Sequence, residues 1–111
     1  MAIISNLTVD QGSTFNATID VTDTGGSATN LTDFSVAGQV RKSYSSSTAI
    51  NFVSSITDAA NGVVSISLSD TVTNNMKAGR YVYDVEILSA GGTRTRVLEG
   101  QLEVTPGVTQ I

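Results

Sequence analysis

The last third of the sequence constrains the fold most, because it contains two long segments in which apolar and polar residues alternate. These segments, residues 79–88 and 96–104, are separated by a stretch that contains the pair Gly91-Gly92. Alternation with a period of two is typical of a half-buried strand, and a Gly-Gly pair favours a tight turn. The sequence therefore predicts a β-hairpin with Gly91-Gly92 as its two-residue loop.

The register that this loop imposes brings the apolar faces of both strands to the same side of the hairpin. A slip by one residue would place the apolar side chains of one strand against the polar face of the other. We expect Gly100 to leave space for an aromatic ring on the inward face. The predicted pairs are Val85 with Leu98, Tyr83 with Gly100 and Tyr81 with Leu102.

The first half of the chain contains further segments with the strand pattern. Short strands are predicted around Leu7 and Val9, over residues 15–21 and over residues 34–41, with a turn at residues 23–27 between the last two. Residues 43–48 are rich in hydroxyl groups, which predicts an exposed loop. Apolar residues resume at position 50 and begin the next strand.

The pair Asn61-Gly62 predicts a second hairpin, but not one with a two-residue loop. Such a loop would place Ile56 opposite Ser67, out of phase with the apolar residues of the following strand. A longer loop or a bulge, with Gly62 at positive φ, restores the phase. Ile56 is then expected to pair with Ile66 or Leu68.

A single helical turn is predicted between residues 69 and 79. Ser69 or Asp70 is suited to cap it, Val72 and Met76 would face inward, and Gly79 would end it. About seven strands with one short helical turn before the penultimate strand are typical of an immunoglobulin-like antiparallel β-sandwich. Antibody domains also carry a Cys, Trp, Cys core, which this chain lacks, so only the architecture is predicted.

Tyr81 stands at the start of the penultimate strand, and two structural roles are open for it. Immunoglobulin-like sandwiches often place a tyrosine there whose hydroxyl bonds to upstream backbone. Alternatively, it is a core tyrosine with its hydroxyl at the rim of the sandwich. We expect residues 1–111 to form a single domain with short terminal tails.

Composition argues against several classes of function. The 111 residues contain no His, Cys or Trp, so disulfides, thiolate metal sites and histidine general bases are absent. Six basic residues against ten acidic ones give a net charge of −4, which disfavours binding to nucleic acid. A signal-peptide pattern and a membrane-spanning apolar run are both lacking. The sequence thus predicts synthesis in a cytoplasm, with no membrane or nucleic acid as partner.

Acidic residues offer the only candidates for catalysis. Asp84, Glu86, Glu99 and Glu103 fall on the outward face of the predicted hairpin, with Asp84 directly opposite Glu99. An open sheet face leaves carboxylates solvated, whereas acid–base catalysis needs a cleft that shifts their pKa values. We therefore expect ion pairs with basic residues of the same sheet instead, the candidates being Arg41, Lys42, Arg94 and Arg96.

A calcium site is also disfavoured. Asp20, Asp23, Asp33, Asp58 and Asp70 lie in or near predicted turns, but they do not have the spacing of a dense oxygen-ligand loop. Turn formation by Asp side chains explains these positions better. The sequence therefore predicts no catalytic, cofactor-binding or metal-binding residues, and no enzyme.

Several segments carry a resemblance to a known family. The most specific are residues 79–84, Gly-Arg-Tyr-Val-Tyr-Asp, and the pair Glu99-Gly100 one strand later, and the likeness extends over nearly the whole chain. The sequence resembles small immunoglobulin-like virion structural proteins of tailed bacteriophages. It is most similar to short structural proteins of marine T4-like cyanophages, and more distantly similar to the N-terminal domain of phage baseplate upper proteins.

The resemblance implies a non-enzymatic attachment or decoration module on the tail, baseplate or head of the virion. Its expected partners are other virion proteins in a repeated lattice, with a homo-oligomer as a further option, and no cofactor is implied. In the baseplate family the domain precedes a receptor-binding region. Because this chain ends directly after the domain, that role is not carried over.

The alternative function is a carbohydrate-binding module for weak adhesion to host surfaces. Sugar sites usually present exposed aromatic rings beside polar groups, and Tyr44 is the one aromatic residue expected to be exposed. For the attachment module, the expected contacts are the exposed loop at residues 43–48 and the tails at 1–5 and 106–111. The tails contain apolar residues that continue no evident strand, namely Ile3, Ile4, Val108 and Ile111.

Overall fold

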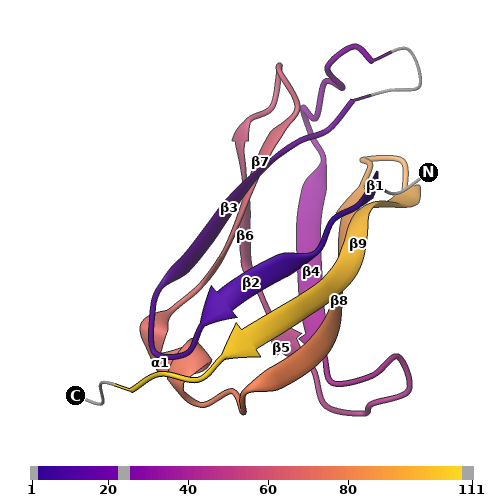
Figure 1. Ribbon diagram of the computed structural model, residues 1–111. Coiled ribbons are helices and arrows are strands. Elements are labelled where there is room, and N and C mark those ends of the chain that lie inside the picture. The colour runs from indigo at the N-terminus through magenta and orange to yellow at the C-terminus, as the bar shows by residue number, and fades with distance from the viewer. Residues whose placement is uncertain (1–2, 23–25, 109–111) are drawn as a thin grey trace.

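The computed structural model describes residues 3–22 and 26–108 and is a sandwich of two β-sheets (Figure 1). The larger sheet contains β1 (Ile3–Ile4), β2 (Leu7–Asp10), β4 (Ser35–Arg41), β5 (Ile50–Asn51), β8 (Gly79–Leu88) and β9 (Arg94–Thr105). The smaller sheet contains β3 (Phe15–Asp20), β6 (Val53–Asp58) and β7 (Val63–Leu68). A short helix, α1 (Asp70–Asn74), precedes β8. The all-β sandwich and its helical turn before the penultimate strand are confirmed.

The order of the strands is that of an immunoglobulin-like sandwich. In the larger sheet β8 lies between β4 and β9, and in the smaller sheet β7 lies between β3 and β6. These neighbours correspond to strands C, F and G facing strands B, E and D of the immunoglobulin fold. The described residues form more strands than the seven expected, because β1 and β5 are additional strands of two residues each.

The N-terminal strands depart from the antiparallel arrangement that the sequence predicts. Both β1 and β2 run parallel to β9, with Ile3 beside Leu98 and Leu7 beside Leu102. Figure 1 shows β2 alongside β9 with both arrowheads pointing the same way. A parallel neighbour is reached only through a long connection, here the whole sandwich. The alternation within residues 7–10 indicates a strand but not its partner.

The segment between β1 and β2 passes directly over Gly100. The Ser5 N–H donates to the Glu99 carbonyl at 2.8 Å, and the Ser5 carbonyl accepts from the Tyr83 hydroxyl. A Cβ atom on Gly100 would collide with the Ser5 carbonyl. Gly100 does lie opposite Tyr83, but the space that it leaves is filled by N-terminal backbone and not by the aromatic ring, so that expectation is wrong.

The register predicted for the final hairpin is confirmed in its central part. Three pairs occur as expected, and they place one apolar face of each strand toward the core: Val85 with Leu98, Tyr83 with Gly100, and Tyr81 with Leu102. Residues 84 and 99 are also directly opposed, on the outward face.

The loop of this hairpin is longer than the predicted Gly91-Gly92. The Ser89 N–H donates to the Thr93 carbonyl at 2.9 Å, so residues 90–92 form a three-residue loop. Gly92 has φ +91°, a conformation that glycine adopts without strain. A bulge in β9, between the partners of Val85 and Glu86, adds one residue to that strand. The extra loop residue and the bulge compensate each other, which preserves the predicted register.

The hairpin of β6 and β7 has the predicted phase but a different partner. Gly62 has φ +69°, and the loop spans residues 59–62, as the longer-loop prediction requires. Ile56 pairs with Val64 and not with Ile66 or Leu68. The register shifts by one residue next to Ile56, so a bulge and a longer loop occur together, whereas the sequence predicts one or the other.

The capping prediction for α1 is confirmed at its N-terminus. The Ser69 hydroxyl accepts from the Val72 N–H at 3.3 Å, and Asp70 occupies the first turn. The helix ends with Asn75 as C-cap, so the prediction that it continues to Gly79 is wrong. Gly79 is instead the first residue of β8.

The inward face of α1 closes one end of the sandwich. Met76 is buried and Val72 partly buried, as predicted, and Thr73 is fully buried. The Thr73 hydroxyl donates to the Ser13 carbonyl at 2.8 Å and accepts from the Gly12 N–H at 3.1 Å. These bonds attach the helix to the turn between β2 and β3.

The inner faces of both sheets form the core, and Tyr81 is part of it. Its hydroxyl donates to the Lys77 carbonyl at 2.8 Å, which is the tyrosine corner of immunoglobulin-like sandwiches. Of the two roles left open for Tyr81, the structure therefore selects the first. The buried core residues of the main cluster are Val9, Val40, Phe52, Ile66, Leu68, Met76, Tyr81, Tyr83, Val85, Leu98, Leu102 and Val104.

The tails differ from each other. Ile3 and Ile4 form β1, so the expectation that they continue no strand is wrong, although both side chains are exposed. Val108 is 97% exposed, and Ile111 lies outside the described residues. Within the described ranges no helix is long and apolar enough to cross a membrane.

Candidate functional site

A shallow hollow of about 480 Å³ lies on the outer face of the larger sheet. Ala37 and Val82 line it together with longer polar side chains. Residues of β4, β5, β8 and β9 contribute, together with the loop after β4. The principal polar and aromatic side chains that line it are Gln39, Arg41, Tyr44, Asn51, Asp84, Glu86, Arg94, Arg96 and Glu99.

Strand alternation explains why these side chains share one face. In β8 the odd-numbered residues from 81 to 87 are buried, so Val82, Asp84 and Glu86 point outward. Antiparallel pairing sets Gln39 and Glu99 on either side of Asp84. Cross-strand neighbours on the same face of a sheet contact one another. The acidic row of β8 thus lies between polar residues of β4 and β9.

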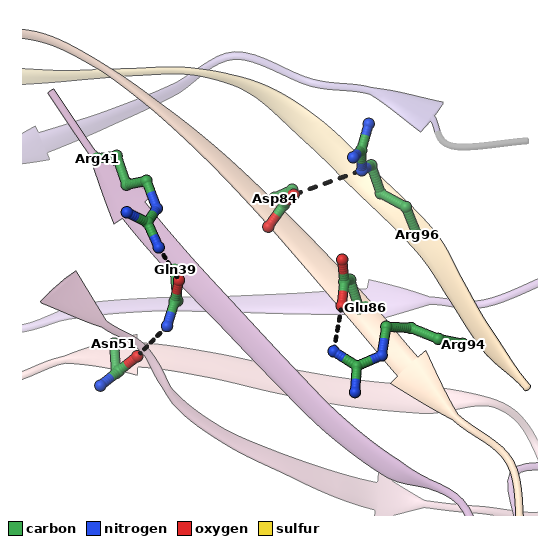
Figure 2. A network of polar contacts seen from close by, with 7 residues as sticks. All are labelled: Gln39, Arg41, Asn51, Asp84, Glu86, Arg94 and Arg96. Atoms are coloured by element: carbon green, nitrogen blue, oxygen red, sulfur yellow. Dashed lines mark hydrogen bonds and ion pairs between the residues drawn. The ribbon is translucent and has the colours of Figure 1, made fainter. Parts of the chain in front are cut away.

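Ion pairs connect the acids of this face with the arginines of β9. The Arg96 guanidinium lies 3.4 Å from the Asp84 carboxylate and 3.3 Å from that of Glu99. Arg94 lies 3.4 Å from the Glu86 carboxylate, and Figure 2 shows both arginines reaching from β9 toward β8. The expected pairing of the acids with Arg94 and Arg96 is confirmed. Exposed pairs of this kind contribute about 0–1 kcal/mol each to stability.

The surroundings of Asp84 change the pKa of its carboxyl group. Burial raises the pKa of the Asp84 carboxyl, the negative charge of Glu86 raises it further, and the positive charge of Arg96 opposes the change. Glu103, the fourth acid of the predicted group, lies opposite Arg80 and is not part of the hollow. The structure therefore gathers three of the four predicted acids.

Arg41 and Lys42 do not form the predicted ion pairs with these acids. Arg41 donates to the Ser46 carbonyl at 2.6 Å and to the Gln39 amide oxygen at 3.0 Å. The Lys42 ammonium lies over the Tyr81 ring, 4.6 Å from its centre. Both cations find other partners because β4 places Gln39, not a basic residue, beside Asp84.

An amide pair continues this polar row toward β5. The Gln39 amide nitrogen donates to the Asn51 amide oxygen at 2.9 Å, so Arg41, Gln39 and Asn51 form a chain of hydrogen bonds (Figure 2). No pattern in the sequence predicts Gln39 and Asn51 as site residues. The alternation of residues 34–41 already put Gln39 on the outward face, but the two-residue strand β5 gives no pattern of its own.

Tyr44 contributes the aromatic side chain of the hollow. It lies in the loop after β4, is 84% exposed and lines the hollow with Arg41 and Asn51. Its predicted exposure is confirmed, as is that of most of the loop at residues 43–48. An exposed ring beside hydrogen-bonding groups can stack against a planar or ring-shaped ligand.

The aspartates considered for calcium serve local structure where they are described. Asp33 has φ +66° in a turn closed by the Phe34 N–H and the Leu31 carbonyl at 3.0 Å. Asp58 accepts from the Asn61 amide at 2.9 Å, Asp70 lies in the first turn of α1 and Asp20 ends β3. Asp23 lies outside the described residues. Within those residues no group of three acids is placed to hold a metal ion.

Comparisons with known proteins give only a distant structural likeness. No family model and no curated protein matches the chain. Among solved structures, an internalin-like protein of Listeria monocytogenes has a TM-score of 0.46 at 14% identity, covering 96% of this chain and 28% of that one. A family 123 glycoside hydrolase from Clostridium perfringens has a TM-score of 0.45 at 14% identity, with 97% and 24% covered.

This chain therefore spans about a quarter of the length of each of these two structures. At such identities and TM-scores neither likeness bears on function, and the assignment of the fold depends on the strand order described above. What the hollow can do follows from its side chains alone. It offers hydrogen-bond donors, acceptors and the exposed ring of Tyr44 on one face of the sheet, which suits binding of a polar ligand.

Proposed function

We propose that this chain is a non-enzymatic attachment or decoration module of a tailed bacteriophage particle, located in the virion and bound to a repeated protein lattice of tail, baseplate or head. The observation that supports it best is the apolar edge of the larger sheet. Ile3 and Ile4 are 55% and 74% exposed on β1, which is the outermost strand there. Apolar side chains on an open sheet edge favour contact with another protein chain.

The smaller sheet offers a second edge of this kind. β6 is one of its two edge strands, and Val53 at the start of β6 is 69% exposed. An outermost strand has backbone N–H and C=O groups directed away from the sheet, and an extended segment of a neighbour can pair with them. The same edges would serve a homo-oligomer, which is the alternative partner.

A lattice makes modest affinity sufficient. When many copies bind a repeated array, each one needs only a weak contact to be retained if the copies are also linked to one another. The proposal that this lattice belongs to a phage particle is supported by the resemblance of residues 79–84 and 99–100 to tailed-phage virion proteins.

Localisation on purified particles tests this function. We expect mass spectrometry to detect the chain in purified virions, and cryo-electron microscopy to show sandwich-shaped density repeated with the symmetry of the lattice. Absence of the chain from particles that are otherwise complete would refute the proposal.

Paired edge variants identify the contact. The double substitution Ile3→Ser and Ile4→Ser should lower the copy number per particle. Val53→Ser is the matched change on the edge of the other sheet. Reduced incorporation with Val53→Ser alone would move the contact to β6. If both variants were incorporated as well as the parent chain, both edges would be excluded as the contact.

A second candidate function is a carbohydrate-binding module for weak adhesion to host surfaces. The observation that favours it is the position of Tyr44, whose exposed ring borders the hollow beside Arg41, Gln39 and Asn51. Aromatic rings next to amide and guanidinium groups match the apolar faces and the hydroxyls of sugar rings. A reproducible hit on a glycan array, lost with Tyr44→Ala, would place this function ahead of lattice attachment.

A further inference from the structure

The hollow contains one arginine that differs from the other two. Arg94 and Arg96 both form ion pairs with acids of the same face. Arg41 forms no ion pair within the described part of the chain, and its two hydrogen-bond acceptors, the Ser46 carbonyl and the Gln39 amide, are uncharged. Arg41 therefore brings a positive charge to the hollow that no carboxylate neutralises by direct contact.

The Arg41 guanidinium is also held in place. Its Nη1 is bound at 2.6 Å and its Nη2 at 3.0 Å, and Gln39 is itself fixed by Asn51 at 2.9 Å. A guanidinium has five N–H donors, so three remain after these two bonds. Fixed, unused donors of this kind match a carboxylate, which accepts two parallel N–H bonds.

The neighbours of Arg41 limit what such a ligand can be. The exposed ring of Tyr44 lines the same hollow, as do the acids Asp84, Glu86 and Glu99. A strongly anionic ligand such as a phosphate would meet these acids. A ligand with a single carboxylate and several hydroxyls places its charge at Arg41 and hydrogen-bonds the acids through its hydroxyls.

We infer that the hollow binds an acidic saccharide, with the carboxylate of one uronic acid unit held by Arg41 and the ring of that unit against Tyr44. This inference depends on the second candidate function, carbohydrate binding, and specifies its ligand class. In Figure 2 the Arg41–Gln39–Asn51 chain lies on one side of Asp84, and Arg94 and Arg96 lie on the other side. The carboxylate of the ligand would lie on the Arg41 side of Asp84, and its hydroxyl groups would extend toward the side of Arg94 and Arg96.

The test compares one saccharide with and without its charge. Methyl galacturonoside, which has a single carboxylate, and its methyl ester are titrated into the ¹⁵N-labelled chain, and amide chemical shifts are followed by NMR. We expect the acid to shift amides near Gln39, Asn51 and Asp84 and to bind about tenfold more tightly than the ester, a difference of about 1.4 kcal/mol. Arg41→Gln should abolish the preference, and Arg41→Lys should retain part of it.

Arg80 provides the matched control, because it is an exposed arginine on the outward side of β8 beyond the hollow. Arg80→Gln should leave both affinities unchanged, and the dispersion of the NMR spectrum reports whether each variant is folded. Equal binding of acid and ester would overturn the inference and leave carbohydrate binding intact. No shift with either saccharide would overturn the inference, and the glycan array tests carbohydrate binding separately. Binding that Arg41→Gln leaves unaltered would also overturn the inference alone.

Discussion

Gly100 is the residue at which a single added methyl group tests the N-terminal contact. A Cβ atom there would collide with the Ser5 carbonyl, and a valine is larger still. We expect Gly100→Val to lower the free energy of unfolding by about 1–3 kcal/mol, as overpacking does in other proteins. Chemical denaturation of the variant and the parent chain measures this.

A shortened chain without the Ser5 carbonyl provides the control for the Gly100→Val variant. In a chain that lacks residues 1–5 the Ser5 carbonyl is absent, so Gly100→Val should cost less there than in the full chain. An equal cost in both backgrounds would mean that Gly100 is needed for another reason, and equal midpoints for variant and parent would contradict the contact itself.

Thr73 is the fully buried polar residue whose bonds join α1 to the turn after β2. Replacement by valine keeps the shape of the side chain but leaves the Gly12 N–H and the Ser13 carbonyl without this partner. We expect Thr73→Val to destabilise the fold by about 0.5–1.5 kcal/mol, the net contribution of a typical hydrogen bond, because Gly12 and Ser13 are exposed and water can bind the groups that lose this partner. Thr73→Ser retains the hydroxyl and should lose clearly less in the same denaturation experiment. Equal losses would assign the effect to packing of the methyl group.

Asp84 should make stability depend on pH in an unusual direction for a carboxylate. Burial and the charge of Glu86 raise its native pKa above the ordinary value of 3.8, so the native state holds the proton more tightly than the unfolded state. The stability that Asp84 contributes in this way is fully present below its pKa in the unfolded state. It is lost as the pH rises through its pKa in the native state.

The variant Asp84→Asn isolates this contribution, since it cannot titrate. As the pH falls from 7 toward 4, the unfolding free energy of the parent should rise relative to that of Asp84→Asn, within the window that begins at the native pKa and ends near 3.8. Denaturation at several pH values gives the difference. NMR titration of the Asp84 carboxyl carbon gives the pKa directly, and a midpoint at or below 3.8 would contradict the prediction.

At the scale of elements, the three-residue loop of the final hairpin depends on its last residue. Gly92 has φ +91°, whereas Gly91 is not in the left-handed region. We expect Gly92→Ala to destabilise the fold by about 1–2 kcal/mol, the usual cost of left-handed backbone for a residue with a Cβ atom. Gly91→Ala is the matched control and should be nearly neutral. The two-residue loop that the sequence suggests would instead make both changes costly, because both glycines would have positive φ.

At the scale of the whole molecule, the described part of the C-terminal tail is peripheral to the sandwich. Pro106 and Val108 are exposed, and Gly107 makes one bond, from its N–H to the Gln11 amide oxygen at 3.2 Å. We expect deletion of residues 106–111 to leave the denaturation midpoint almost unchanged while lowering retention on the particle or in an oligomer. Particle copy number and solution mass are the two readouts. Unchanged incorporation and unchanged mass would exclude the tail as a contact, leaving the edges at β1 and β6.

Features that depend on neighbouring residues can be predicted from the amino-acid sequence. The alternation of residues 79–88 fixed which side chains of β8 face the core, because successive side chains of a strand point to opposite faces. Ser69 as helix cap and Gly62 at positive φ followed from local chemistry in the same way. Tyr81 was recognised as a corner candidate from its place at the start of a strand.

The contacts between distant segments become visible only in the folded chain. β1 and β2 pair in parallel with β9, which lies at the other end of the chain. This pairing brings Ser5 over position 100 and explains why a glycine is needed there. The hydrogen-bond partners of Arg41 and Gln39 likewise depend on the positions of β5 and of the loop before it. Such contacts are selected by the packing of the complete sandwich, in which many segments compete for the same edge, so no local pattern encodes them.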